Sequence, residues 1–213
     1  MSAGRGPAVD LAPFGLRIGH ADDAEGATGC TVLLAEGPAL RAAHALVGRA
    51  SATRELAAAS PDHLVGRAHA LLLTGGSAYG LDAAGGVMRW LEARGRGFPV
   101  GAGVVPIVPA AALFDLAPLG RFDRRPDAAM AAAACDAARP VADAHGSVGA
   151  GAGATVGKAL GAAGAMKGGL GVAAAWEGAA VGGGPGDALG VAAVAAVNAF
   201  GDVRDAAGRV LAG

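Results

Sequence analysis

Two glycine-rich segments of this sequence carry residue types that could do chemistry. Ser77 lies in Gly-Gly-Ser-Ala-Tyr, residues 75–79, which approximates the strained turn that exposes the nucleophile of many serine hydrolases. That turn requires Gly at its last position, where this chain has Tyr79. We therefore expect Ser77 to be structural and to cap a following helix, with its hydroxyl bonded to a free backbone N–H.

The second segment ends in Gly-Lys at Lys158 and approximates a phosphate-binding loop. The motif requires Gly where the chain has Ala152, and a hydroxyl residue where it has Ala159. Residues 149–154 satisfy the looser glycine pattern of dinucleotide-binding folds, but no strand clearly precedes them and no amphipathic helix clearly follows. The sequence therefore disfavours nucleotide binding, and we expect no cofactor.

Four residues stand out because Ala, Gly, Arg, Pro and Val dominate the composition. Asn198 is the single Asn, Tyr79 the single Tyr, and Lys158 and Lys167 are the two Lys of the chain. All four lie in or beside glycine-rich segments, where a side chain can approach a neighbouring backbone closely. They are the first candidates for a functional site.

Cysteine and histidine spacing gives no sign of a metal. Cys30 and Cys135 lie far apart without metal-type spacing, so we expect buried free thiols. The histidines form neither an H-x-H nor an H-x-x-x-H pair, and we expect no zinc site. They are His20, His44, His63, His69 and His145.

Length, charge and hydropathy limit the class of protein. The chain has 213 residues, of which 53% are hydrophobic, which suits one domain with a sizeable core. A net charge of −1 without a dense Lys/Arg run disfavours nucleic acid as a partner. Residues 1–7 lack the apolar core of a secretory signal, and the longest uncharged stretch, residues 97–114, contains three prolines. We expect a cytoplasmic protein that does not bind membranes.

The elements that must position the candidates change character along the chain. Short buried strands are predicted at 31–34 and 70–73, a helix from Ser77 to about residue 93, and another helix over 127–139. Residues 104–108 predict a strand broken by Pro106. After a glycine-rich loop over 146–157, three strands with tight turns are predicted at 171–176, 179–182 and 189–199.

This order of elements predicts a fold class. Strands with helices come early and successive antiparallel strands come late, which favours an α+β or layered α/β architecture over a doubly wound nucleotide fold. The 38 glycines lie between apolar runs, so they predict close backbone packing around small residues.

The run from Leu71 to Glu92 closely resembles the signature of the L-aminopeptidase/D-esterase family, which includes β-peptidyl aminopeptidases and nylon-oligomer hydrolases. Further segments resemble the family in the same order, so the resemblance covers nearly the whole chain. They are residues 15–20, 103–109, 114–116, 149–158, 167–171 and 196–202. After residue 171 the family often has a small hydroxyl residue, where this chain has Val172.

The resemblance implies an α/β fold, a four-layer α/β/β/α sandwich shared with ornithine acetyltransferase. It also implies a precursor that cuts itself before a Ser or Thr, which becomes the amino-terminal nucleophile. Asn198 is followed by Ala199, so no Asn-Ser or Asn-Thr junction occurs here. We expect residues 1–213 to be a single domain, the α-chain portion, completed by a nucleophile-bearing β-chain outside them.

The same resemblance implies roles for three of the rare residues. Lys158 would lie near the nucleophile, where its charge favours the neutral terminal amine that acts as base and stabilises a developing alkoxide. Asn198 would hold the oxyanion or substrate, and Tyr79 would hydrogen-bond the substrate or tetrahedral intermediate. The structural alternatives are that Lys158 is a solvated loop lysine, that Asn198 belongs to a turn at a strand end, and that Tyr79 is a partly buried aromatic residue. Lys167 is expected to be structural.

Three functional hypotheses follow. The first is hydrolysis of N-terminal amino-acid amides, esters or small peptides, through an acyl-enzyme on the β-chain nucleophile, in an oligomer of αβ units. The second is a non-catalytic binding or assembly chain, since residues 1–213 lack the expected nucleophile. The third is an acyl transferase like ornithine acetyltransferase, which the run from Leu71 to Glu92 fits less well.

Overall fold

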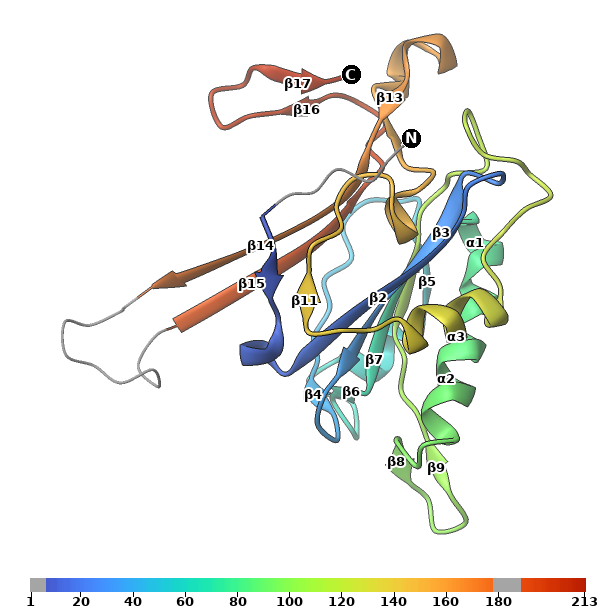
Figure 1. Ribbon diagram of the computed structural model, residues 1–213, viewed down its shortest axis with the longest axis vertical. Helices are drawn as coiled ribbons and strands as arrows, with labels where there is room; N and C mark the ends of the chain where they lie inside the picture. The colour runs from blue at the N-terminus through green and yellow to red at the C-terminus, as the bar shows by residue number, and fades with distance from the viewer. Residues whose placement is uncertain (1–6, 178–188) are drawn as a thin grey trace.

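A five-stranded mixed sheet forms the centre of the fold (Figure 1). The structure is a computed structural model that describes residues 7–177 and 189–213. Strand β10 runs parallel to β7, and all other neighbouring strands of this sheet are antiparallel. In sheet order the strands are β2 (Leu16–Asp23), β3 (Thr28–Ala35), β7 (Ala70–Thr74), β10 (Ala110–Ala112) and β5 (Ala52–Arg54).

Helices cover one face of this sheet. Helix α1 (Ser77–Gly80) continues through a 3₁₀ turn (Leu81–Ala83) into α2 (Ala84–Glu92), and α3 (Ala128–Asp136) packs beside α2. Both predicted helices are confirmed, although the first contains the 3₁₀ turn. The shared core includes Cys30, Val32, Leu34 and Leu72 from the strands and Val87, Leu91, Ala131 and Ala134 from the helices.

The start of the first helix differs from the prediction. Gly76 occupies the cap position, and no side chain caps the helix. Ser77 is instead the first helical residue, with a left-handed φ of 55°. The predicted capping role of Ser77 is therefore wrong, whereas Asp127 caps α3 by accepting a bond of 2.8 Å from the Met130 N–H.

Close backbone packing accounts for several of the glycines, as predicted. A Cβ atom on Gly86 would lie 2.1 Å from the carbonyl oxygen of Ala128, where α2 meets α3. A Cβ atom on Gly19 would lie 1.9 Å from the carbonyl oxygen of Ala134, where α3 meets β2. Larger residues at these positions would force the elements apart.

A long hairpin covers the opposite face of the sheet (Figure 1). Strands β14 (Gly169–Glu177) and β15 (Leu189–Val197) pair antiparallel, which confirms the predicted antiparallel second half. The predicted strand at 179–182 lies outside the described residues. The inner face of the hairpin packs Val172, Ala192 and Val194 on Leu11, Ile18 and Leu33. Val172, which stands where the family often has a hydroxyl residue, thus lies in an apolar core.

Two strand predictions differ from the structure. No strand was predicted at β2, yet it pairs along the whole of β3. Only Val104–Val105 (β9) of the predicted 104–108 strand pairs, with β8 (Phe98–Pro99), because Pro106 has no N–H to donate.

The other short pairs are β1 (Val9–Asp10) with β11 (Val141–Ala142), β4 (Leu40–Arg41) with β6 (Arg67–Ala68), β12 (Thr155–Val156) with β13 (Met166–Lys167), and β16 (Val203–Arg204) with β17 (Val210–Ala212).

The two cysteines are buried free thiols, as predicted. Burial raises the pKa of both the Cys30 and the Cys135 thiol to about 12. Neither thiol is therefore ionised near neutral pH, so neither is a nucleophile there. Within the described parts of the chain, no helix has the length and apolar character needed to cross a bilayer.

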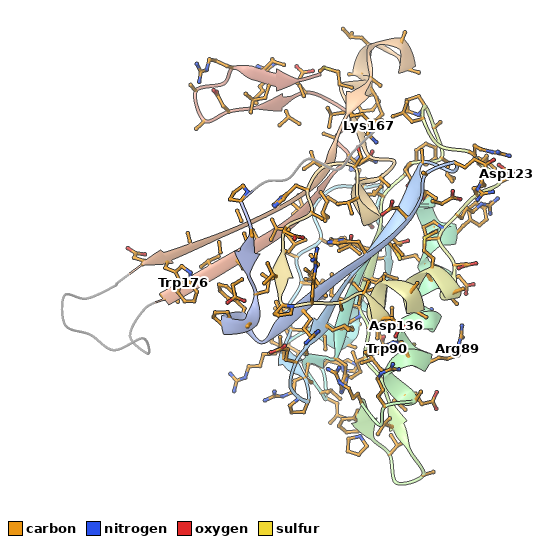
Figure 2. The ribbon with its side chains drawn as sticks, viewed as in Figure 1. Arg89, Trp90, Asp123, Asp136, Lys167 and Trp176 are labelled. Carbon is orange, nitrogen blue, oxygen red and sulfur yellow. The ribbon has the colours of Figure 1, made fainter. Side chains whose placement is uncertain are left out.

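The outer face of the β14–β15 hairpin leads to a prediction about association. Leu189, Val191 and Val197 are exposed on this face. Trp176, near the far end of the hairpin (Figure 2), belongs to the inner face and lies against the Phe14 ring, with ring centroids 5.2 Å apart. Because contiguous apolar surface promotes association, we expect residues 1–213 expressed alone to self-associate. Light scattering after gel filtration should show species heavier than 20.2 kDa.

A charge placed on that face should reduce the association. Val191 is 61% exposed on the hairpin, and Val47, in a loop elsewhere, is 93% exposed. We expect Val191→Lys to shift the population toward monomer and the matched control Val47→Lys to leave it unchanged. Equal effects of the two variants would contradict an interface on the hairpin.

His20 makes the stability of the fold sensitive to acid. Its Nδ1 lies 2.9 Å from the Thr31 hydroxyl, and burial lowers its pKa to about 4. The unfolded chain takes up this proton below about pH 6.5, whereas the folded chain does so only near pH 4. The contribution of His20 to folding is therefore lost as the pH falls through this window, by at most about 3 kcal/mol.

Chemical denaturation at pH 7 and pH 4.5 tests this expectation. Wild type should lose more unfolding free energy between the two pH values than His20→Gln, which has no proton to bind. Equal losses in the two proteins would show that His20 does not cause the acid sensitivity.

Candidate active site

Lys158 and Asn198 meet directly, although forty positions separate them in the sequence. Lys158 begins a 3₁₀ turn (Lys158–Leu160) that follows β12 through Gly157, whose φ is 70°. Asn198 is the residue after the last one of β15. The Lys158 ammonium donates a hydrogen bond of 3.0 Å to the Asn198 side-chain oxygen, Oδ1.

Neutral oxygens alone surround the Lys158 ammonium in the described structure. Its Nζ donates to the Thr155 carbonyl at 2.6 Å and lies 3.1 Å from the Thr155 hydroxyl. None of the ion pairs found among the described residues includes Lys158. Burial lowers its pKa, since it penalises the charged form. The site therefore holds a positive charge that no carboxylate neutralises, which suits stabilisation of a developing anion.

The Asn198 amide joins three segments of the chain. Its Oδ1 accepts a hydrogen bond of 3.0 Å from the Thr155 N–H in addition to the bond from Lys158. Its Nδ2 donates a bond of 2.9 Å to the Phe114 carbonyl. A side-chain amide has two N–H groups, so one remains to bind another acceptor.

Tyr79 lies apart from this pair. It belongs to α1 and is 56% exposed, with the Arg125 guanidinium 4.0 Å above its ring and the Phe122 ring 6.3 Å away. Its phenol makes no hydrogen bond to Lys158 or Asn198. The structure therefore brings together two of the three predicted site residues, and the role of Tyr79 stays a prediction.

The backbone nonetheless links Tyr79 to the pair. The Ser77 N–H donates a bond of 3.0 Å to the Leu113 carbonyl, and the next residue, Phe114, accepts from Asn198. The first turn of α1 and the Asn198 amide thus bond to consecutive residues of one segment.

The loop before Lys158 does not act as a phosphate cradle. The Gly149 N–H donates to the Asp22 carboxylate at 3.1 Å, and the Ala150 N–H donates to the Thr31 hydroxyl at 3.1 Å. Phosphate-binding loops leave such N–H groups free for the ligand. These internal bonds agree with the incomplete match to the phosphate-binding motif, and they argue against nucleotide binding here.

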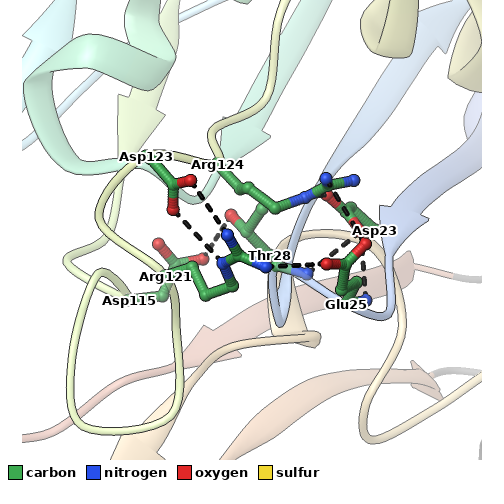
Figure 3. Close-up of polar contacts among 8 residues, drawn as sticks. Asp23, Glu25, Thr28, Asp115, Arg121, Asp123 and Arg124 are labelled. Atoms are coloured by element: carbon green, nitrogen blue, oxygen red, sulfur yellow. Dashed lines mark hydrogen bonds and ion pairs between the residues drawn. The ribbon is translucent and has the colours of Figure 1, made fainter.

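Sequence reasoning missed a buried carboxylate beside the site, Asp115. Its two oxygens accept hydrogen bonds of 2.7 Å from the Thr28 hydroxyl and from the Gly76 N–H. Figure 3 shows the bond to Thr28. Burial raises the pKa of Asp115, and these bonds oppose that rise. The signal in the sequence was an acid between the apolar residues Phe114 and Leu116, which lie in a segment that resembles the family.

Lys167, which we expect to be structural, belongs to the strand that pairs with β12. Figure 2 shows it on β13, and its ammonium donates to the Ala152 carbonyl. Burial lowers its pKa, while the charge of Asp115 raises it. No bond connects Lys167 to Lys158 or Asn198 in the described part of the chain.

The most prominent charged cluster in the close-up joins the end of β2 to residues 121–124. Figure 3 shows Arg121 and Arg124 paired with Asp23, Glu25 and Asp123. Exposed pairs of this kind contribute little to stability, about 0–1 kcal/mol each. They give no reason to assign a ligand.

A family comparison identifies the relatives of this chain. The family model described as peptidase family S58 matches residues 11–210. This chain belongs to peptidase family S58.

An uncharacterized aminopeptidase of Mycobacterium tuberculosis (strain ATCC 25618 / H37Rv) is 45% identical over 201 residues, which cover 91% of this chain and 53% of the relative. An uncharacterized aminopeptidase of Mycobacterium leprae is 46% identical over 165 residues, 75% of this chain and 42% of the relative. The S58 chain thus spans about half the length of the curated relatives it matches.

Solved structures confirm the fold class. The L-aminopeptidase D-Ala-esterase/amidase of Ochrobactrum anthropi, described as a new variant among the Ntn hydrolase fold, aligns with a TM-score of 0.69 at 16% identity. The match covers 93% of the S58 chain and 55% of that chain. A β-aminopeptidase of Burkholderia sp. aligns with a TM-score of 0.59 at 22% identity, covering 93% and 54%. The predicted layered α/β fold and the family resemblance are both confirmed.

Proposed function

We propose that the whole protein is an N-terminal-nucleophile aminopeptidase that cleaves N-terminal amino-acid amides, esters or small peptides. The observation that carries this proposal is the Lys158–Asn198 pair, in which neutral oxygens alone hold an ammonium beside a side-chain amide with a free N–H. Such a pair suits an oxyanion formed during acyl transfer. Membership in peptidase family S58 supports the same reaction class.

In this proposal residues 1–213 are the α-chain portion of a self-processed, cytoplasmic protein. A companion β-chain supplies a Ser or Thr nucleophile at its amino terminus, and αβ units assemble into an oligomer. The sequence relatives, which are about twice as long as the region they share with this chain, leave room for such a segment. No cofactor takes part.

The chemistry requires the residues of both chains. The Ser or Thr hydroxyl attacks the substrate carbonyl, and its proton passes to the nucleophile's own α-amine, whose pKa is about 8. Lys158 favours the neutral form of that amine by charge repulsion, and the Asn198 N–H stabilises the oxyanion. The α-ammonium then protonates the leaving amine or alcohol, and water hydrolyses the acyl-enzyme. Tyr79 would hydrogen-bond the substrate or the tetrahedral intermediate from its exposed position.

Intact-mass analysis of the protein purified from its native gene, with amino-terminal sequencing of every chain, tests the proposal. We expect two chains, one of which begins with Ser or Thr, and hydrolysis of an amino-acid p-nitroanilide. The N-acetylated p-nitroanilide is the matched control and should not react if a free amino terminus is required. A single uncut chain without activity would overturn the proposal in favour of a binding or assembly chain.

A further inference from the structure

The turn that leads into Tyr79 has an unfavourable backbone conformation. Gly76 and Ser77 have φ values of 78° and 55°, so two consecutive residues are left-handed. Glycine adopts this conformation readily, but serine does so only when its surroundings hold it there. Ser77 has neither a catalytic role in the proposed mechanism nor a capping role, so the conformation needs another explanation.

Asp115 holds this turn from the buried side. Its carboxylate is 0% exposed and accepts the Gly76 N–H at 2.7 Å. The other carboxylate oxygen accepts the Thr28 hydroxyl at 2.7 Å, which fixes the rotation of the carboxylate. A Cβ atom on Gly75 would lie 1.9 Å from Asp115 Oδ2, so the turn has little room to move toward it.

The residues before Asp115 bond to both parts of the site. The Leu113 carbonyl accepts a hydrogen bond of 3.0 Å from the N–H of Ser77, which lies two residues before Tyr79. The Phe114 carbonyl accepts from the Asn198 amide at 2.9 Å. Residues 113–115 therefore contact the turn of Tyr79 twice and Asn198 once.

We propose that Asp115 is a positioning residue, which fixes the Tyr79 turn relative to the Lys158–Asn198 pair through its bond to the Gly76 N–H. The inference rests on the proposed function, because it assigns Asp115 to the same site. Asp115 is buried away from solvent and acts on the substrate only through Tyr79. Asparagine can replace it, since the amide oxygen can accept from Gly76 while the amide N–H donates to the Thr28 hydroxyl.

A double-mutant cycle in the full, self-processed protein tests this role. Small displacements of a substrate-contacting group cost rate steeply, so we expect Asp115→Ala to lower kcat/KM by about tenfold to a hundredfold. We expect Tyr79→Phe to lower kcat/KM as well, and Asp115→Ala to add less than about threefold in the Tyr79→Phe background. Asp115→Asn should stay within about threefold of wild type because it keeps the bond to Gly76.

Thr28→Val separates positioning from stability. It removes the second hydrogen-bond partner of Asp115 but leaves the bond to Gly76, so we expect a lower Tm and a loss of kcat/KM smaller than that of Asp115→Ala. All variants are compared below the lowest Tm. If Asp115→Ala does not fold, Asp115→Ser replaces it, because its shorter side chain cannot reach the Gly76 N–H but leaves a hydroxyl in the buried space.

The outcomes distinguish this inference from the proposed function. Additive losses from Asp115→Ala and Tyr79→Phe, or an Asp115→Asn variant as impaired as Asp115→Ala, would overturn the positioning role while the aminopeptidase stands. An inactive wild type would overturn the proposed function itself. An active wild type with an unaffected Tyr79→Phe would remove the role of Tyr79 and the positioning inference with it.

Discussion

Replacing Lys158 with Met should lower kcat by at least about 100-fold in the self-processed protein. Met has a similar length and fills the same space, but it removes the one positive charge that the site offers to a developing anion. Among the residues that the structure describes, the ammonium has only neutral partners, so it needs no release from a carboxylate there before it can act. Steady-state hydrolysis of an amino-acid p-nitroanilide measures the effect.

Lys167→Met is the matched control for this variant. Lys167 is the other lysine of the chain, it is half-buried, and burial lowers its pKa too, but its ammonium bonds to the Ala152 carbonyl. We expect its kcat to change by less than about tenfold, because its ammonium bonds to the Ala152 carbonyl and to neither Lys158 nor Asn198. Similar losses from both variants would indicate damage to the fold instead of loss of a catalytic charge.

The pH dependence of kcat gives a second test of the role of Lys158. Since burial lowers its pKa, Lys158 loses its proton at a lower pH than an exposed lysine does. The charged form is the active one in the proposed mechanism, so kcat should fall as the pH rises through that pKa.

Replacing Asn198 with Asp should lower kcat by about 100- to 1,000-fold. The substitution keeps the oxygen that accepts from Thr155 and Lys158 but removes both amide N–H groups. One lost N–H would have bound the oxyanion, and the other binds the Phe114 carbonyl. The new carboxylate oxygen would face that carbonyl and repel it, and the negative charge would oppose an anion in the site. Kinetics and thermal unfolding of the same preparation measure both consequences.

Asn198→Ala separates the lost donor from the added charge. It removes the N–H groups without adding a negative charge, so we expect a loss of at least about 100-fold here as well. Full activity of Asn198→Ala beside an inactive Asn198→Asp would show that the charge, and not a missing donor, stops the reaction. Retained activity in both variants would remove Asn198 from the site.

Local patterns in the sequence were sufficient for much of the fold. The apolar spacing from Leu81 to Leu91 predicted the first helix, and Pro126 and Pro140 bounded the second. The short apolar runs at 31–34 and 70–73 predicted β3 and β7. These predictions held because helix and strand periodicity depend on neighbours in the sequence.

Strand β2 and Ser77 show where such patterns are insufficient. Strand β2 was not predicted, and it pairs with β3 along its whole length. Ser77 has the sequence context of a cap, yet it is left-handed in a turn whose Gly76 N–H donates to the Asp115 carboxylate and whose Ser77 N–H donates to the Leu113 carbonyl. In both cases partners distant in the sequence decide the backbone conformation.

The sequence by itself determined the family, the layered α/β fold and the candidates Tyr79, Lys158 and Asn198. Only the tertiary structure decided that Lys158 bonds to Asn198, that Tyr79 lies apart from them, and that residues 113–115 bond both to the turn before Tyr79 and to Asn198. The physical reason is that a polar side chain bonds to whichever backbone groups the fold brings within about 3 Å, and residue type alone does not specify those groups.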